Sequence, residues 1–230
     1  MAIDRAALAA SIDQTLLKPT VGFKAAAEWI EQSSQLGFAS LCVSPFLVPV
    51  TTQLLSGTST KVCSVCGFPL GYSMTESKAE EATHLVNLGC QEVDMVMNVA
   101  ALLESEDAFV KDDIAAVVAA VRDASRGTGL VKVILETGYL SDEQIVRASR
   151  IAVAAGADFV KTSTGFGPRG ASVEDVRAMR STVGPDIGVK AAGGIRDLDA
   201  ALAMIEAGAN RIGSSAGIEI LAAFDARSGE

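Results

Sequence analysis

Short runs rich in strand-forming residues recur along the chain at intervals of roughly thirty residues, and a stretch with helical periodicity separates each run from the next. The pattern predicts eight strands, of which the first is the weakest, over residues 11–17, 38–43, 61–66, 92–98, 130–137, 158–163, 187–192 and 210–215. Eight βα units in 230 residues are typical of the (β/α)8 or TIM barrel of the α/β class. An open doubly wound sheet is the alternative, although it normally has fewer strands.

The segments between these runs have readable helix ends. In residues 141–156, Ser141 can cap a helix, Asp142 and Glu143 suit its first turn, and Gly156 can end it. Further helices are expected near the N-terminus, where one is short, and over residues 23–36, 73–88, 100–124, 172–182, 198–207 and 217–226. No linker or low-complexity block divides the chain, so we predict a single catalytic domain over residues 1–230.

Composition and charge exclude several classes of function. Hydrophobic residues make up 49% of the chain and aromatic residues only 5%, so small and branched aliphatic side chains must fill the core. The formal net charge of −9 repels polyanions, which argues against nucleic acid and anionic membranes as partners. The first residues do not resemble a secretory signal, so we expect a cytoplasmic protein. Cys63 and Cys66 fall on opposite faces of one predicted strand, which favours buried thiols over a redox pair or metal site.

Lysines inside the predicted strands indicate the chemistry. Burial of Lys132, Lys161 or Lys190 against the helix layer would be costly, so all three should point into the barrel lumen. Asp94, on an earlier strand, should point into the same space and transfer a proton. Lys161 and Lys190 lie on consecutive strands, and two close cations lower each other's affinity for protons. One amine can then be neutral at about pH 7 and attack a carbonyl group, although a purely structural network of these four residues is the competing interpretation.

Two turns of small residues, AAGGIRD and IGSSAG, follow the seventh and eighth predicted strands. Their glycines let backbone amides approach an anion, the following helix N-termini add their dipoles, and Ser214 or Ser215 can donate a hydroxyl. Barrels commonly bind phosphate at these two loops. The loop after Lys161 adds another glycine-rich turn, with Arg169 as a counter-charge. We therefore expect a phosphosugar site formed by Gly165, Gly193, Gly194, Gly213, Ser214 and Ser215.

Six motifs occur in order over nearly the whole chain: IDQTLLKP, EVDMVMN, LVKVILETG, FVKTSTGFG, VKAAGGIRD and RIGSSAG. In this combination the sequence resembles the deoxyribose-phosphate aldolase family, cytoplasmic class I aldolases with a (β/α)8 fold that act in deoxyribose phosphate catabolism. The resemblance implies reversible cleavage of 2-deoxy-D-ribose 5-phosphate to D-glyceraldehyde 3-phosphate and acetaldehyde, without metal or organic cofactor. It also implies that Lys161 forms the Schiff base and that Lys190 perturbs it. Asp94 would join the proton relay, and Lys132 would support this network.

The chain departs from the family pattern at three places. Gln14 replaces a histidine, Ala216 replaces a serine, and the tail AFDARSGE lacks the tyrosine found in some members; we expect these changes to affect efficiency rather than reaction class. Asp13 and Thr15 are expected to hold substrate hydroxyls. Another class I aldolase acting on a different phosphosugar and a non-catalytic phosphosugar-binding barrel are the alternatives. The outer-helix surfaces leave open whether the protein forms a homodimer or a homotetramer.

Overall fold

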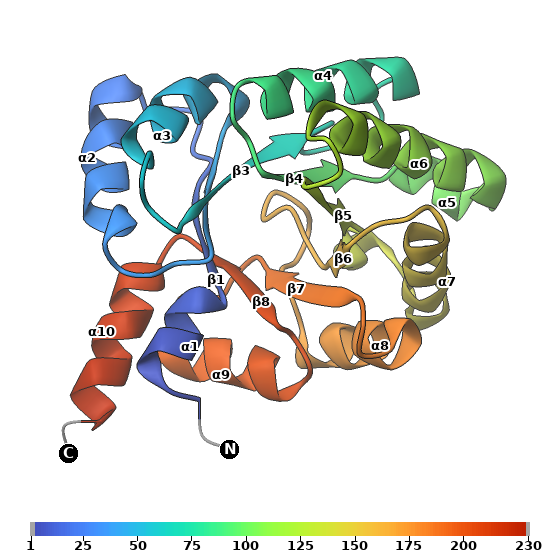
Figure 1. Ribbon diagram of the computed structural model, residues 1–230. Helices are drawn as coiled ribbons and strands as arrows, with labels where there is room; N and C mark the ends of the chain where they lie inside the picture. The colour runs from blue at the N-terminus through green and yellow to red at the C-terminus, as the bar shows by residue number, and fades with distance from the viewer. Residues whose placement is uncertain (1–2, 229–230) are drawn as a thin grey trace.

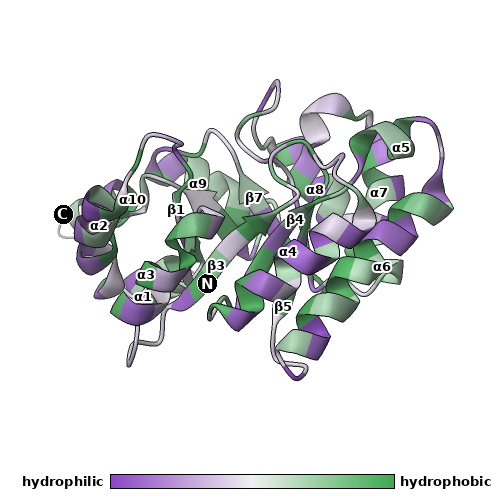
Figure 2. Cartoon of the chain, turned by 90° about the horizontal axis from the view of Figure 1, so that it is seen from above, coloured by the Kyte–Doolittle hydropathy of each residue, from purple (hydrophilic) through white to green (hydrophobic). Residues whose placement is uncertain are grey.

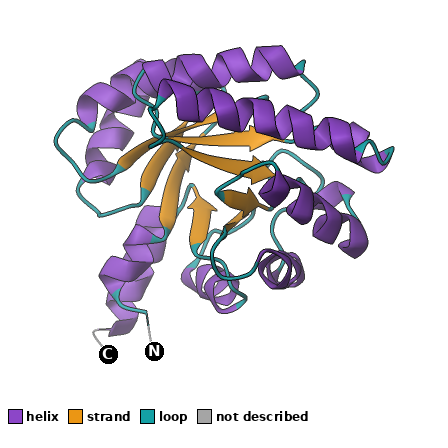
Figure 3. Ribbon diagram, turned by 45° about the vertical axis from the view of Figure 1, so that its right-hand side comes forward, coloured by secondary structure: helices purple, strands orange, loops and turns teal. Residues whose placement is uncertain are grey.

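In the computed structural model, which describes residues 3–228, eight parallel strands close into a barrel (Figure 3). They are β1 (Ile12–Leu16), β2 (Ser40–Val43), β3 (Lys61–Cys66), β4 (Glu92–Val96), β5 (Leu130–Ile134), β6 (Phe159–Lys161), β7 (Gly188–Ala192) and β8 (Arg211–Ser214). Each strand pairs with its neighbour in chain order, and β8 pairs with β1. The predicted (β/α)8 barrel is therefore confirmed, and every expected strand is present.

Helices surround the strands on all sides (Figure 1). They are α1 (Arg5–Ala10), α2 (Phe23–Ser34), η1 (Pro45–Leu47), α3 (Val48–Leu54), α4 (Thr75–Asn87), α5 (Val99–Leu103), α6 (Asp107–Ala124), η2 (Thr137–Tyr139), α7 (Asp142–Ala154), α8 (Val173–Val183), α9 (Leu198–Glu206) and α10 (Gly217–Ser228). The short N-terminal helix is α1, as expected. Within the described residues, none of these helices has the length and apolar content that a membrane span requires.

One helix expectation is wrong. Residues 100–124 do not form a continuous helix, because Ser105 adopts a positive φ of 65° between α5 and α6. Arg147 stabilises this break by donating hydrogen bonds to the Ser105 hydroxyl and the Leu102 carbonyl. By contrast, α7 begins as predicted, since Ser141 forms a capping box with Gln144.

The two faces of the barrel wall differ in chemistry. Outward side chains such as Val93, Val131 and Val160 are fully buried in the aliphatic layer under the helices. Figure 2 shows that the surrounding helices alternate between hydrophobic and hydrophilic residues, as expected for helices packed on one face. Cys66 belongs to this outer layer, where its sulfur lies 3.2 Å from the Lys78 carbonyl of α4, whereas Cys63 faces the lumen. The predicted opposite orientation of these two thiols is confirmed, and all four cysteines are free and buried.

Candidate active site

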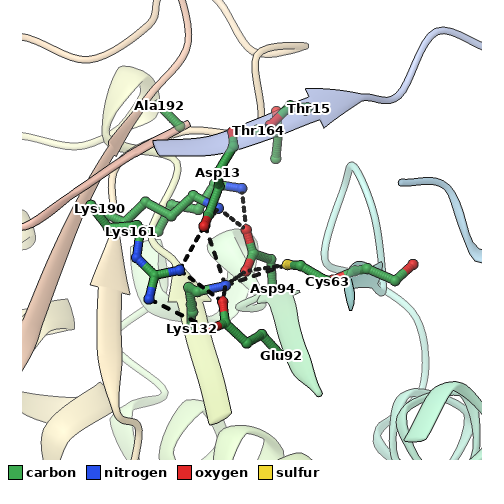
Figure 4. Close-up of polar contacts among 12 residues, drawn as sticks. Asp13, Thr15, Cys63, Glu92, Asp94, Lys132, Lys161, Thr164, Lys190 and Ala192 are labelled. Atoms are coloured by element: carbon green, nitrogen blue, oxygen red, sulfur yellow. Dashed lines mark hydrogen bonds and ion pairs between the residues drawn. The ribbon is translucent and has the colours of Figure 1, made fainter. Parts of the chain in front are cut away.

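Asp94 on β4 lies among the three lysines that were predicted to face the lumen (Figure 4). Its Oδ1 is 2.8 Å from Lys132 Nζ, and its Oδ2 is 2.7 Å from Lys161 Nζ and 2.6 Å from Lys190 Nζ. The strand register explains this meeting, because Asp94 pairs with Lys132 across β4 and β5, and Lys161 pairs with Lys190 across β6 and β7. The structure thus brings together all four residues that were singled out from the sequence.

A second group of charges lies closer to the amino ends of the strands. Lys190 Nζ is 2.5 Å from Asp13 Oδ2, and Lys132 Nζ is 2.7 Å from Glu92 Oε2. Arg211 Nη1 is 2.6 Å from Asp13 Oδ1 and 2.9 Å from Glu92 Oε2. Asp13 is fully buried and also accepts a hydrogen bond from the Ser40 hydroxyl at 2.6 Å. Asp13 therefore contacts basic side chains, and its expected contact with a substrate hydroxyl stays a prediction.

The charged groups of this lumen cluster do not cancel. It contains three carboxylates and four basic side chains: Asp13, Glu92, Asp94, Lys132, Lys161, Lys190 and Arg211. With every group ionised, the cluster has one more positive than negative charge. Loss of one lysine proton would balance it.

Burial and charge shift the pKa values in this cluster in opposite directions. Burial alone would raise the pKa of the Asp94 carboxyl. The positive charges of Lys132, Lys161 and Lys190 together lower it by more, so the net pKa lies well below its ordinary value. For Lys190, burial lowers the pKa, whereas Asp13 and Asp94 raise it, and the net pKa lies above its ordinary value. The pKa of Lys132 is raised for the same reasons. Lys190 is therefore not the lysine that becomes a neutral amine, because two carboxylates face it and outweigh the neighbouring positive charge.

Lys161 differs from the other two lysines in its contacts and its access. Among the described residues, its only carboxylate contact is with Asp94 Oδ2, an oxygen that it shares with Lys190. Lys161 ends β6, and it lines a cavity of about 200 Å³ at the carboxyl ends of the strands, whose lining includes neither Lys132 nor Lys190. A small molecule in this cavity can reach the amine of Lys161 without entering the lumen cluster.

The same cavity holds every residue predicted for the phosphate site. Its lining includes Gly165, Gly193, Gly194, Gly213, Ser214 and Ser215, together with Thr15. Gly193 and Gly194 have φ angles of 90° and 81°, a region that favours glycine. A Cβ atom on Gly194 would meet nothing within 4 Å, so this turn opens directly onto the cavity. The two loops can therefore present backbone amides to an anion.

The two serines of the eighth loop are not equivalent. The Ser214 hydroxyl donates to the Ile195 carbonyl at 2.7 Å and accepts from the Ala216 amide at 3.0 Å. Ser214 therefore holds the seventh and eighth loops together, while the exposed Ser215 offers its hydroxyl to the cavity.

The arginine that lines this cavity is not the one expected from the sequence. Arg169 forms an ion pair with Asp175 and donates to the Thr137 carbonyl, and it does not line the cavity. Arg196, exposed in the loop after β7, does line it. Arg196 belongs to the AAGGIRD motif, so the sequence could have indicated it. The sequence analysis named only the glycines of that motif as phosphate-site residues.

Gln14, which stands where the family pattern has a histidine, makes a structural contact that the sequence did not indicate. Its side chain is buried, and its Oε1 accepts a hydrogen bond from the amide of Gly217, the first residue of α10, at 2.9 Å. Gln14 thus holds the start of α10 beside the candidate phosphate site. The structure describes the C-terminal tail up to Ser228, and the expectation for its last two residues lies outside the described part.

Two groups in the lumen, one of Cys42, Cys63 and Asp94 and one of Asp13, Cys63 and Glu92, each have potential ligand atoms within 4.8 Å of one another, but neither suits a metal ion. Asp13 and Glu92 are already paired with Arg211. Asp94 is already paired with three ammonium groups, and Lys132 Nζ lies 3.3 Å from the Cys63 sulfur. Burial also raises the pKa of the Cys63 thiol and so opposes the thiolate form that binds metals. This arrangement favours amine chemistry at this site.

The fold and the site together define a class of protein, a (β/α)8 barrel with a reachable lysine amine beside a glycine-rich anion pocket. Comparison with known proteins makes the assignment specific. The sequence model described as DeoC/LacD family aldolase matches residues 7–223. The chain belongs to this family of aldolases, which are lyases, and the resemblance inferred from the motifs is confirmed.

Individual relatives of known name match this chain over almost their full length. The chain is 52% identical to a deoxyribose-phosphate aldolase of Caldanaerobacter subterraneus subsp. tengcongensis, over 93% of this chain and 92% of the relative. It is 51% identical to a deoxyribose-phosphate aldolase of Bacillus subtilis, over 97% of this chain and 98% of the relative. The tetrameric deoxyribose phosphate aldolase structure from Aeropyrum pernix superposes with a TM-score of 0.89 at 32% identity, covering 97% of this chain and 93% of that chain.

Proposed function

We propose that this aldolase reversibly cleaves 2-deoxy-D-ribose 5-phosphate to D-glyceraldehyde 3-phosphate and acetaldehyde, with Lys161 as the Schiff-base lysine. The observation that carries the proposal is the joint lining of one cavity by Lys161 and the glycine-rich loops after β7 and β8. The names of relatives that are about half identical supply the substrate. A cavity lined both by an amine and by glycine-rich loops suits a sugar with a carbonyl group at C1 and a phosphate at C5.

The first half of the reaction forms an iminium ion. The neutral amine of Lys161 attacks C1 of the open-chain sugar to give a carbinolamine, which loses water. The Asp94 carboxylate, 2.7 Å from Lys161 Nζ, and the Lys190 ammonium, 2.6 Å from the same carboxylate oxygen, form the proton relay for these steps. Lys132 holds the other oxygen of Asp94 and so fixes the orientation of the carboxylate.

The second half breaks the bond between C2 and C3. The 3-hydroxyl loses its proton, C3 becomes the aldehyde carbon of D-glyceraldehyde 3-phosphate, and the electron pair of the broken bond moves through C2 into the iminium nitrogen. The resulting enamine takes a proton at C2, and hydrolysis releases acetaldehyde and the free amine. Because the iminium is the electron sink, we propose that no metal or organic cofactor takes part.

The phosphate is proposed to lie against the glycine-rich loops of this cavity. The amides of Gly193 and Gly194, the Ser215 hydroxyl and the Arg196 guanidinium would bind its oxygens, and Gly165 would leave room for it. Gly213 also lines the cavity, and a Cβ atom there would meet the Ala192 Cβ at 2.9 Å, so it lets β8 pack closely on β7 beneath the phosphate. Ser214 would act indirectly, since it fixes the loop that carries Ser215.

Trapping the iminium tests this proposal. Incubation with acetaldehyde, reduction with borohydride and peptide mass mapping should place an ethyl group on Lys161. Lys161→Ala and Lys161→Arg should each lower kcat by roughly a thousandfold or more, since the nucleophile is lost. The control Lys24→Ala changes an exposed lysine of α2 and should leave kcat unchanged. An adduct on Lys190 would exchange the two roles, and an absent adduct with wild-type turnover would exclude the mechanism.

We further propose that the chain works as one catalytic domain over residues 1–230, in the cytoplasm, in deoxyribose phosphate catabolism. Strands from Ile12 to Ser214 all belong to one barrel, which supports the single domain. Four buried free thiols suit a reducing compartment. Protease digestion of the folded protein should leave this unit intact, and two stable fragments would contradict it.

We also propose that the protein is a homo-oligomer, with the dimer and the tetramer as the candidate states. The relative from Aeropyrum pernix is described as tetrameric. In this chain, Phe23 and Phe46 are 60% and 52% exposed, and their rings meet edge to face at 5.2 Å. Phe46 also lines an outer groove of about 560 Å³ between α3 and α4. Light scattering should show an oligomer that Phe46→Ser weakens, and a wild-type monomer would refute the proposal.

A further inference from the structure

Arg211 is the one basic residue of the lumen cluster that has no role in the proposed mechanism. It is the first residue of β8, at the amino end of the barrel, and it does not line the cavity that Lys161 reaches. Its guanidinium bonds Asp13 and Glu92 at 2.6 and 2.9 Å, and it lies 5.3 Å from the centre of the Phe159 ring. Arg211 is therefore linked to Lys190 and Lys132 through the carboxylates that it shares with them.

The contacts of Arg211 decide which carboxylates are left for the lysines. Asp13 faces Lys190 and Lys132 with one oxygen but gives the other to Arg211. Glu92 faces Lys132 but shares the same Oε2 with Arg211. Asp94 alone then has no contact with the guanidinium; its two oxygens serve three ammonium groups, and Oδ1 also accepts from the Cys63 thiol at 3.4 Å. The three carboxylates of the lumen therefore face four positive charges, and one positive charge stays unbalanced.

The charges of the lumen lead to the same result. The groups that face one another from the eight strands are Asp13 (β1), Cys42 (β2), Cys63 (β3), Glu92 and Asp94 (β4), Lys132 (β5), Lys161 (β6), Lys190 (β7) and Arg211 (β8). Without Arg211, three lysines would face three carboxylates, and all three could keep their protons. With Arg211, which does not lose its proton, one lysine proton is in excess.

We propose that Arg211 is a positioning residue whose fixed charge makes the lumen cluster release one lysine proton, so that Lys161 is the neutral amine that the reaction needs. The proposal rests on the Schiff-base role proposed above for Lys161. Lys161 is the amine that loses the proton because it has the fewest carboxylate contacts and the only access to the cavity. Arg211 acts through the carboxylates and never meets the substrate.

A merely structural Arg211 would tie β8 to β1 and β4 and would affect stability alone. The two roles separate in the pH profile of kcat/KM for the cleavage of 2-deoxy-D-ribose 5-phosphate, followed by acetaldehyde release. Removing the positive charge makes the cluster hold its protons more tightly. Arg211→Gln should therefore move the acid limb to higher pH by about one unit, which is a roughly tenfold loss of kcat/KM on that limb. Arg211→Lys keeps the charge and should keep the midpoint.

Changes at Glu92 give a prediction of opposite sign. Glu92→Gln removes a negative charge from the same cluster, so the proton should leave more easily and the acid limb should move to lower pH. The double variant Arg211→Gln/Glu92→Gln removes one charge of each sign, and its midpoint should return to within about 0.3 units of wild type. If Arg211 were only structural, the double variant would not be expected to bring the midpoint of the acid limb back to its wild-type value.

The outcomes distinguish this inference from the proposed function. Failure to trap acetaldehyde on Lys161 of the wild-type protein would overturn the Schiff-base proposal itself. An adduct on Lys161 together with an unmoved midpoint in Arg211→Gln would overturn only the role of Arg211. If Arg211→Gln does not fold, Glu92→Gln decides, and an unmoved or raised midpoint in that variant would overturn the inference.

Discussion

Two buried carboxylates should make the free energy of unfolding fall steeply in acid. Asp13 and Asp94 are both 0% exposed, and although burial raises their pKa values, the neighbouring lysines lower both well below the ordinary value, with Arg211 contributing at Asp13. A carboxyl with a depressed folded pKa adds stability above the unfolded pKa of about 3.9, and this stability is lost as the pH falls below that value. Each carboxyl contributes a slope of about 1.4 kcal/mol per pH unit there, so the pair gives about 2.8 kcal/mol per pH unit.

Urea unfolding at pH values from about 3.5 to 2.5, followed by the fluorescence of the single tryptophan, Trp29, measures this slope. Asp94→Asn should reduce the slope by about 1.4 kcal/mol per pH unit, because one of the two titrating groups is gone. Asp13→Asn should do the same. The control Asp225→Asn changes a carboxylate with a side chain 49% exposed, and it should leave the slope as in wild type. Equal slopes in wild type, Asp94→Asn and Asp13→Asn would refute the reasoning.

Three further changes test other parts of the structure. Lys190→Leu removes one positive charge from the lumen cluster, so its pH profile of kcat/KM should move upward by about one unit; a profile unchanged in height and position would return Lys190 to a structural role. Arg196→Gln should raise the KM for the phosphorylated sugar roughly tenfold or more but leave the KM for 2-deoxyribose unchanged, and equal effects on both sugars would contradict a phosphate contact. Lys78→Met leaves the buried Asp113 without its partner at 2.7 Å and should cost about 3–5 kcal/mol of unfolding free energy in urea, most of which Lys78→Met/Asp113→Leu should restore.

The barrel could be predicted from the sequence because period and spacing determine it, whereas the exact strand ends could not. The run EVDMVMN looks uniform over residues 92–98, yet β4 ends at Val96, where the chain leaves the ladder towards α5. The break at Ser105 was equally hidden, since it depends on Arg147, a residue far away in sequence. Hydrophobic periodicity reports which face is buried, and it carries no information on such long-range contacts.

The site shows the same division between local and long-range information. Lysines in the middle of apolar strands have only the lumen available, and for this reason Lys132 and Lys190 could be placed from sequence. Arg211 was missed because a charge near the start of a predicted strand is ordinary at the surface. The choice between Arg169 and Arg196 depended on where Asp175 lies, which the glycine pattern does not reveal.

The charged lumen sets a limit on how far this barrel can be stabilised without loss of its chemistry. Other (β/α)8 barrels fill this space with layers of branched aliphatic side chains, and replacing a buried ionic cluster by well-packed hydrophobic residues is often neutral or stabilising. Here the same positions carry the amine, the proton relay and their counter-charges. A laboratory selection for heat tolerance alone should therefore accumulate aliphatic substitutions at Lys132, Glu92 and Arg211. A selection that also requires turnover should leave these three residues unchanged and accumulate its stabilising substitutions in the outer helices.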